Sequence, residues 1–183
     1  MKIVLKNVRL SFPNLFQPQS VNGSEPKFNA SFLIEPGSDT AKALEATIEQ
    51  TAKEKWGAKA DTVLKQLRAG DKLCLHDGDA KDYDGYAGML YVSASNSTKP
   101  MVLDKNAKTH LDSTSGKPYA GCYVNASIDV WAQDSQYGRR INAGLRGVQF
   151  IRDGDAFAGG GAATEEEFAD LAVTDDEEEE ALV

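Results

Sequence analysis

Cysteine and histidine are scarce in this chain, with two residues of each type among 183. Cys74 and Cys122 stand far apart, whereas a disulfide scaffold or a cysteine-based zinc site needs more cysteines at closer spacing. His76 and His110 lie in no recognisable nucleophile motif. We therefore predict no cofactor, no metal and no enzymatic activity.

Long apolar runs are also absent. No stretch approaches the roughly 20 residues that are needed to span a bilayer. Lys2 and Lys6 interrupt the short apolar segment at the N-terminus, so a secretory signal peptide is not predicted. We expect the protein to act in the cytoplasm.

Charge is unevenly distributed along the chain. The 20 Lys and Arg residues against 28 Asp and Glu residues give a net charge of −8. Residues 1–152 hold every base and 16 of the acids, a net of +4, while residues 153–183 hold 12 acids and no base. The sequence thus predicts a mildly basic folded domain over 1–152, followed by a Gly-rich linker and a disordered acidic tail over 153–183.

Strand patterns dominate the predicted domain. We expect strands over residues 1–12, 27–35, 72–76, 86–95, 121–132 and 139–152. The clearest is 121–132, where every second residue from Cys122 to Val130 is apolar and predicts one buried face. In the first strand we expect Ile3, Leu5, Leu10 and Phe12 to be buried.

A helical pattern replaces the strand pattern after residue 37. Ser38 or Asp39 can cap a helix in which an apolar residue recurs at every fourth position from Leu44 to Trp56. A second short helix is expected at about 60–68. Short antiparallel strands with one helical insertion predict a mainly β fold, a small antiparallel barrel of the OB type, with a β-sandwich as the alternative.

Aromatic and basic residues provide the functional signal. Flat rings stack on unpaired bases and cations follow the phosphates, which is what single-stranded nucleic acid requires of a protein. The candidate stacking rings are Tyr86, Tyr91, Tyr123, Trp131 and Tyr137. The candidate phosphate contacts are Lys99, Lys105, Lys108, Lys117, Arg139, Arg140 and Arg146. Burial of the rings in the core, and a merely solvated loop for the lysines, are the alternative interpretations.

The acidic stretch from Asp77 to Asp84 suggests a different function, a metal-dependent nuclease. Clustered carboxylates can hold calcium or magnesium. As a calcium loop the stretch fails, because Lys81 takes the place of a ligand and Asp82 the place of the required glycine. We favour an acidic, turn-forming loop between two strands.

Several motifs resemble a known family. They are Val8–Phe16 (VRLSFPNLF), residues 28–34 (FNASFLI), residues 121–132 (GCYVNASIDVWA), residues 137–143 (YGRRINA) and residues 147–150 (GVQF). Together these stretches are similar to phage single-stranded DNA-binding proteins, over about residues 3–158 and in the character of the tail. The resemblance implies an OB fold that coats and protects single strands during phage DNA replication or recombination in the host cytoplasm.

The acidic tail has two interpretations. It either only keeps the protein soluble, or competes with DNA for the basic domain and is freed for protein partners when DNA binds. The resemblance implies contact with replication proteins, and the candidate partner-binding residues are Asp175, Asp176, Glu177, Glu178, Glu179 and Glu180. Such tails usually end in an aromatic residue, whereas this one ends in Leu182-Val183. The alternative function is a non-enzymatic structural or adaptor protein whose acidic tail binds a basic partner, with the body inert toward nucleic acid.

Overall fold

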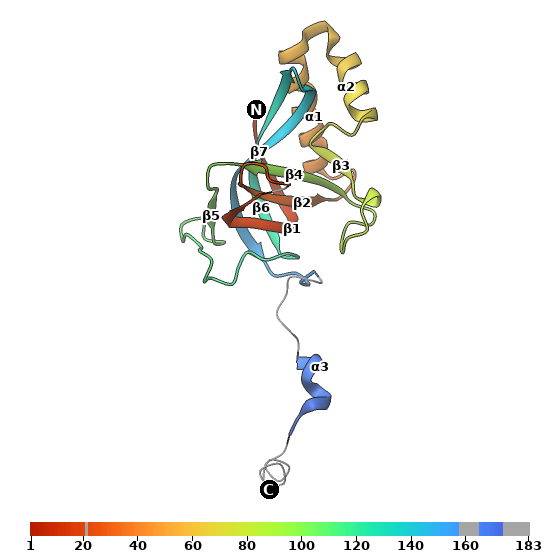
Figure 1. Ribbon diagram of the computed structural model, residues 1–183. Helices are drawn as coiled ribbons and strands as arrows, with labels where there is room; N and C mark the ends of the chain where they lie inside the picture. The colour runs from red at the N-terminus through yellow and green to blue at the C-terminus, as the bar shows by residue number, and fades with distance from the viewer. Residues whose placement is uncertain (21, 158–164, 174–183) are drawn as a thin grey trace.

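The computed structural model describes residues 1–20, 22–157 and 165–173. Its strands are β1 (Lys2–Gln19), β2 (Lys27–Ile34), β3 (Leu75–Asp77), β4 (Leu90–Asn96), β5 (Met101–Leu103), β6 (Tyr123–Ser135) and β7 (Gly138–Arg152). They form one sheet in the order β3-β4-β2-β1-β6-β7-β5, and a further pairing of β4 with β7 closes the barrel β4-β2-β1-β6-β7 (Figure 1). None of the described helices combines the length and the hydropathy that crossing a bilayer requires.

The closed barrel confirms the predicted OB-type architecture, and a single closed sheet is not the alternative two-layer sandwich. The barrel closes in a way that alternation could not predict. β4 and β5 both pair with β7 in parallel, whereas the other strand pairs are antiparallel. β5 lies between the strands expected at 86–95 and 121–132, in a segment for which the sequence analysis names no strand. Three residues are too few to show a strand period.

The buried face of β6 follows its sequence pattern. Val124, Ala126, Ile128 and Val130 are all 0% exposed, as is Cys122 immediately before the strand. Because these side chains fill the barrel, the alternate residues of β6 point outward. That outward face includes Trp131.

β1 departs from the expected alternation. Leu5 and Leu10 are fully buried, but Phe12 is 54% exposed, so the prediction that Phe12 is a core residue is wrong. The register against β6 shifts between Leu5 and Val8, and Asn7 has a positive φ of 54°. An inserted residue of this kind moves every later side chain to the other face. A second positive φ, 46° at Phe12, turns that ring out to solvent.

The helical insertion comprises α1 (Asp39–Trp56), the 3₁₀ turn η1 (Gly57–Lys59) and α2 (Ala60–Ala69). Ser38 Oγ accepts the backbone N–H of Ala41 at 3.2 Å, which is the predicted cap. Leu44, Ile48 and Ala52 are buried. Further short elements are η2 (Gly78–Ala80), α3 (Glu165–Phe168) and η3 (Ala169–Leu171).

The hairpin of β6 and β7 extends beyond the barrel, and the helices lie beside it (Figure 1). We call residues 131–142 of this hairpin the arm. The indole Nε1 of Trp56 donates to Asp134 Oδ2 at 2.9 Å, and the backbone N–H of Ile141 donates to the carbonyl of Lys72 at 3.1 Å. The indole hydrogen bond, more than the nearby Arg139, lowers the pKa of Asp134. Trp56 at the end of α1 therefore holds the first strand of the arm, and Lys72, in the segment that follows α2, holds the second.

Folded contacts continue past the predicted domain boundary at residue 152. Arg9 Nη2 donates to the carbonyl of Asp155 at 2.7 Å, and the Arg9 guanidinium lies 4.3 Å from the ring centroid of Phe157. A Cβ at Gly121, where φ is 105°, would lie 2.2 Å from the Asp155 carbonyl oxygen. The segment that follows β7 is thus held against the barrel as far as Phe157. The predicted Gly-rich linker and the candidate partner residues 175–180 lie outside the described residues.

Both thiols are protected by the fold. Burial raises the pKa of Cys74 to about 12 and that of Cys122 to about 11, and the thiolate is the reactive form of cysteine. We expect the folded protein not to react with Ellman's reagent near neutral pH, and to react at its two cysteines after unfolding in guanidinium. Rapid reaction of either thiol in the folded protein would contradict this packing.

Candidate nucleic-acid interface

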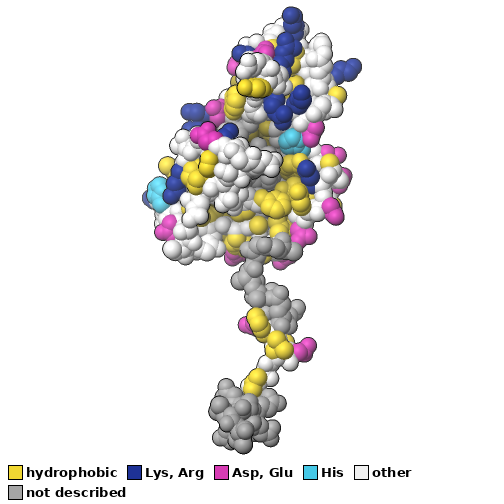
Figure 2. Space-filling view, viewed as in Figure 1, with side chains coloured by type: hydrophobic (Ala, Val, Ile, Leu, Met, Phe, Trp, Pro, Cys, Tyr) yellow, Lys and Arg dark blue, Asp and Glu magenta, His cyan; other side chains and the backbone are white. Residues whose placement is uncertain are grey.

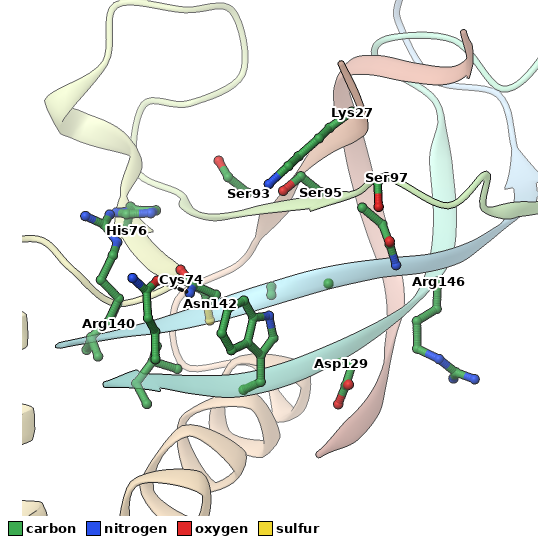
Figure 3. Close-up of a pocket in the computed structure, with 17 residues that line it drawn as sticks. Lys27, Cys74, His76, Ser93, Ser95, Ser97, Asp129, Arg140, Asn142 and Arg146 are labelled. Atoms are coloured by element: carbon green, nitrogen blue, oxygen red, sulfur yellow. Dashed lines mark hydrogen bonds between the residues drawn. The ribbon is translucent and has the colours of Figure 1, made fainter. Parts of the chain in front are cut away.

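A groove of about 660 Å³ crosses the barrel where the arm meets β4 and β2. One wall carries Lys27 of β2 with the serines of β4, and the other carries Trp131 of β6 with Arg140 and Arg146 of β7 (Figure 3). Buried side chains, among them Cys74 and Ile141, form its base. The groove is open, elongated and mostly polar, with one large ring.

Trp131 is that ring, and it is 46% exposed. It follows the buried Val130 on β6 and pairs in register with Asn142 on β7. Its outward position is thus a consequence of strand alternation, and its partner strand supports it from one side. An exposed indole on a groove wall offers the flat face on which a base can stack.

Three cations line the same groove as the ring. Figure 3 shows Arg140 beside His76 at one end of the groove, Arg146 at the other end, and Lys27 extending over Ser93 and Ser95. Arg146 Nη1 is oriented by a hydrogen bond of 3.0 Å to Ser127 Oγ. Within the described part of the chain, neither Lys27 nor Arg140 forms an ion pair.

One carboxylate, that of Asp129, also lines the groove. The amino group of Met1 lies 2.7 Å from Asp129 Oδ1, so this negative charge faces a positive one. The groove therefore keeps a positive balance in which phosphates can be neutralised.

The sequence analysis missed Lys27 and the serines of β4. Ser93, Ser95 and Ser97 recur at every second position and line the same groove. Small hydroxyls leave space over the sheet and supply hydrogen-bond donors, as a surface that accommodates nucleotides requires. The alternation of serine with Val92 and Ala94 was the available signal for this face.

Tyr86 and Tyr91 do not have the exposed faces that stacking requires. They are 2% and 8% exposed and pack with Leu33, and Tyr86 lies in the loop that joins β3 to β4. Tyr86 donates its hydroxyl to Ser11 Oγ at 3.0 Å, and Tyr91 stacks on His76 with ring centroids 4.9 Å apart. In this structure neither ring presents a free face to a base, because the ring of Tyr86 turns inward from the loop and packs against Tyr91, with ring centroids 5.2 Å apart. Strand alternation alone cannot reveal such a contact.

The other two predicted tyrosines lie outside the groove. Tyr123 is half-buried at the far end of β6, with the Arg152 guanidinium 4.0 Å and the Arg9 guanidinium 5.8 Å from its ring centroid. Tyr137 is 83% exposed at the tip of the arm. Next to it, Arg139 lies 3.5 Å from the carboxylate of Asp134 and is partly neutralised.

The predicted lysine contacts are not brought to the groove. Lys99, Lys105 and Lys108 are exposed in the loops on either side of β5, which Figure 1 shows on the side of the body opposite β3. Lys117 is paired with Asp104 at 3.0 Å. None of the four lines the groove. The four lysines remain predicted phosphate contacts for a single-stranded DNA that continues beyond the groove.

The acidic stretch after β3 uses its carboxylates to shape a loop. Asp77 Oδ1 accepts the backbone N–H of Asp79 at 2.9 Å, and Asp79 Oδ1 accepts that of Gly88 at 2.8 Å. In the parts of the chain that the structure describes, no three His, Cys, Asp or Glu side chains are grouped to hold a metal ion. The two hydrogen bonds from backbone N–H groups to Asp77 and Asp79 are those expected of the acidic, turn-forming loop.

Comparison with known proteins places the chain in a family. Residues 1–182 match the family described as "Enterobacter phage Enc34, ssDNA-binding protein". The chain belongs to this family. "Putative protein p50" of Acyrthosiphon pisum secondary endosymbiont phage 1 is 47% identical over 182 residues, which cover 97% of this chain and 98% of that protein.

Solved structures agree with this assignment. The single-stranded DNA-binding protein of bacteriophage Enc34, solved in complex with ssDNA, matches with a TM-score of 0.73 and 32% identity over 86% of this chain and 89% of that one. The gp2.5 protein of bacteriophage T7, a single-stranded DNA-binding protein, matches with a TM-score of 0.57 over 96% of both chains. At 9% identity, the gp2.5 likeness shows the fold alone. The family and the fold that the sequence resemblance implied are confirmed.

Proposed function

We propose that this protein binds single-stranded DNA without sequence preference, in the groove between the arm and β4. The observation that carries the proposal is the half-exposed Trp131 with Lys27, Arg140 and Arg146 in the same groove. Every base has a π-face and every nucleotide a phosphate, so a ring among cations binds all sequences. Membership of the Enc34 family, and the solved complex of the Enc34 protein with ssDNA, support the same ligand.

The role that follows is coating and protection of single strands in phage DNA replication and recombination, in the host cytoplasm. The protein acts by binding and performs no catalytic step. The acidic tail, including Asp175–Glu180, modulates DNA binding and contacts replication proteins. The division into a binding domain over 1–152 and a tail over 153–183 is part of this proposal, with the anchoring contacts of Arg9 extending the folded part to Phe157.

The test is a fluorescence-anisotropy titration of labelled oligothymidine with the full chain at several salt concentrations. With three groove cations, log K is expected to fall by about 2 for each tenfold rise in salt, at about 0.7 per phosphate contact. A mixed-sequence oligonucleotide should bind with similar affinity. Absence of binding at low salt would overturn the proposal and favour the adaptor function, in which the body is inert toward nucleic acid.

Removing the acidic tail is expected to strengthen DNA binding. A chain that ends after Phe157 keeps the Arg9 contacts and loses ten of the tail acids, so a competing polyanion is gone. We expect affinity to rise about threefold or more at 50 mM salt and the difference to shrink at 300 mM, because salt screens the competition. A full-length variant with Asn and Gln in place of the acids at 175–180 separates charge from length. Equal affinities at low salt would show that the tail does not compete.

A further inference from the structure

A second exposed aromatic surface lies next to the groove. Phe12 is 54% exposed and Tyr83 is 50% exposed, with ring centroids 4.9 Å apart in an edge-to-face contact. The two rings and Lys81 border a hollow of about 260 Å³ whose other lining includes Ser31 and Ser93. We call Phe12, Tyr83 and Lys81 the ledge. Figure 2 shows hydrophobic side chains gathered on this face of the body, with acidic side chains along its right edge.

The ledge is held rigidly from below. The buried ring of Tyr86 lies 6.3 Å from Phe12 and 5.3 Å from Tyr83, and its hydroxyl is fixed by the buried Ser11. Phe12 itself has a φ of 46°, a conformation that is costly for a bulky residue. Because this backbone conformation turns a large ring away from the core, the protein loses the stabilising free energy of burying that ring. Strained backbone conformations of this kind are often found at functional sites.

The ledge and the groove are continuous. Ser93 lines both the groove and the hollow of the ledge. Its pair across β2 and β4 is Ser31, with hydroxyls 3.3 Å apart, so two small side chains form part of the surface between the two sites. The stacked pair of His76, on the groove, and Tyr91, in the hollow, spans the same junction. A single strand that leaves the groove at Ser93 therefore meets the ledge next.

We propose that the ledge is a second base-stacking site for the same DNA strand that occupies the groove. This inference rests on the proposed function and extends it along the strand. Phe12 and Tyr83 present flat apolar faces to unstacked bases, and Lys81 lies within the same hollow to meet a phosphate. Asp82 and Asp84 flank Tyr83 in the chain, so residues 81–84 carry a net charge of −1. The ledge therefore binds through stacking, whereas the groove adds phosphate contacts.

This division of roles gives a test with two readouts. The double variant Phe12→Leu, Tyr83→Leu keeps apolar volume over Tyr86 but removes both flat rings. For oligothymidine of about 12 nucleotides we expect at least a tenfold loss of affinity, within the range that stacking rings contribute, with the slope of log K against log salt unchanged. For an oligonucleotide of about 4 nucleotides, short enough to be held by the groove alone, we expect no loss.

The controls separate failure of this proposal from failure of the proposed function. Thermal melting of the variant must match that of the parent, and Tyr83→Ala alone must lower affinity if the ledge acts. Photo-crosslinking of the parent protein with an oligonucleotide that contains 5-iododeoxyuridine should label the peptide that carries Tyr83. The proposal is overturned if the parent binds both oligonucleotides and the ledge variants bind the longer one as tightly as the parent does. In that case the DNA strand does not contact the ledge. If the parent binds neither, the proposed function itself fails.

Discussion

Replacement of Trp131 by alanine is expected to weaken binding of oligothymidine by about 10- to 100-fold. One base stack contributes roughly 1–3 kcal/mol, and a factor of ten in affinity corresponds to about 1.4 kcal/mol. Trp131 is 46% exposed and makes no core contact that the barrel needs, so the loss should fall on binding and leave the melting temperature nearly unchanged. Anisotropy titration and thermal melting measure the two effects separately.

Two further variants give this experiment its controls. Trp131→Phe keeps a flat ring and should retain most of the affinity. Met101→Ala removes another exposed apolar side chain, 55% exposed on β5 and outside the groove, and should change nothing. A Trp131→Ala protein that binds oligothymidine as tightly as the parent would show that the indole does not contribute to DNA binding.

Neutralising the groove cations is expected to have a comparable effect with a different signature. In the triple variant Lys27→Gln, Arg140→Gln, Arg146→Gln, three phosphate contacts are lost. We expect affinity at about 50 mM salt to drop roughly 100-fold and the slope of log K against log salt to shrink by about 2, at 0.7 for each contact. The loss should be the same for all sequences, because phosphates carry no base identity.

A matched variant distinguishes these local contacts from the general charge of the protein. Lys42→Gln, Lys65→Gln, Arg68→Gln removes the same charge from exposed positions on α1 and α2. Long-range attraction alone would make the two triple variants equivalent. The groove interpretation predicts that the helix variant keeps the parental slope, and an equal reduction of slope in both would contradict it.

Much of the barrel could be predicted because strand alternation records burial directly. β6 shows this best, since its four inward residues from Val124 to Val130 are all 0% exposed. The helix cap at Ser38 followed from the same kind of local chemistry. β1 could not be predicted in full, because the positive φ of 46° at Phe12 turns that ring out of the core through a backbone conformation that no pattern of residue types specifies.

The candidate site was less predictable, because it depends on which long-range neighbours cover a side chain. Trp131 and Tyr91 are both aromatic residues in strands, yet one is exposed on the arm and the other is buried against Tyr86. Residue type alone cannot separate them. Lys27 reaches the groove only because β2 pairs with β4, a contact between segments more than 60 residues apart such as Ala30 and Ala94. The loop lysines, which looked equally basic, lie on the other side of the barrel.

The helical insertion gains a structural explanation from these contacts. A two-stranded arm that extends beyond a barrel is only marginally stable by itself. The bond from Trp56 to Asp134 and the bond from Ile141 to Lys72 hold its two strands to the rest of the protein. The arm in turn carries Trp131 at its base and Arg140 on its second strand. Placement of the stacking ring thus depends on helices that need not touch DNA.

The most direct test of the central claim is the fluorescence of Trp131 itself during DNA binding. The chain has two tryptophans, and the Trp56 indole holds the arm, so the emission of Trp131 is obtained as the difference between the parent and the variant Trp131→Phe, which keeps Trp56. Titration with oligothymidine should quench the emission in a saturable manner, with the same midpoint as the anisotropy of labelled DNA, since a stacked base lies against the indole. Binding seen by anisotropy with no change in Trp131 emission would contradict the account.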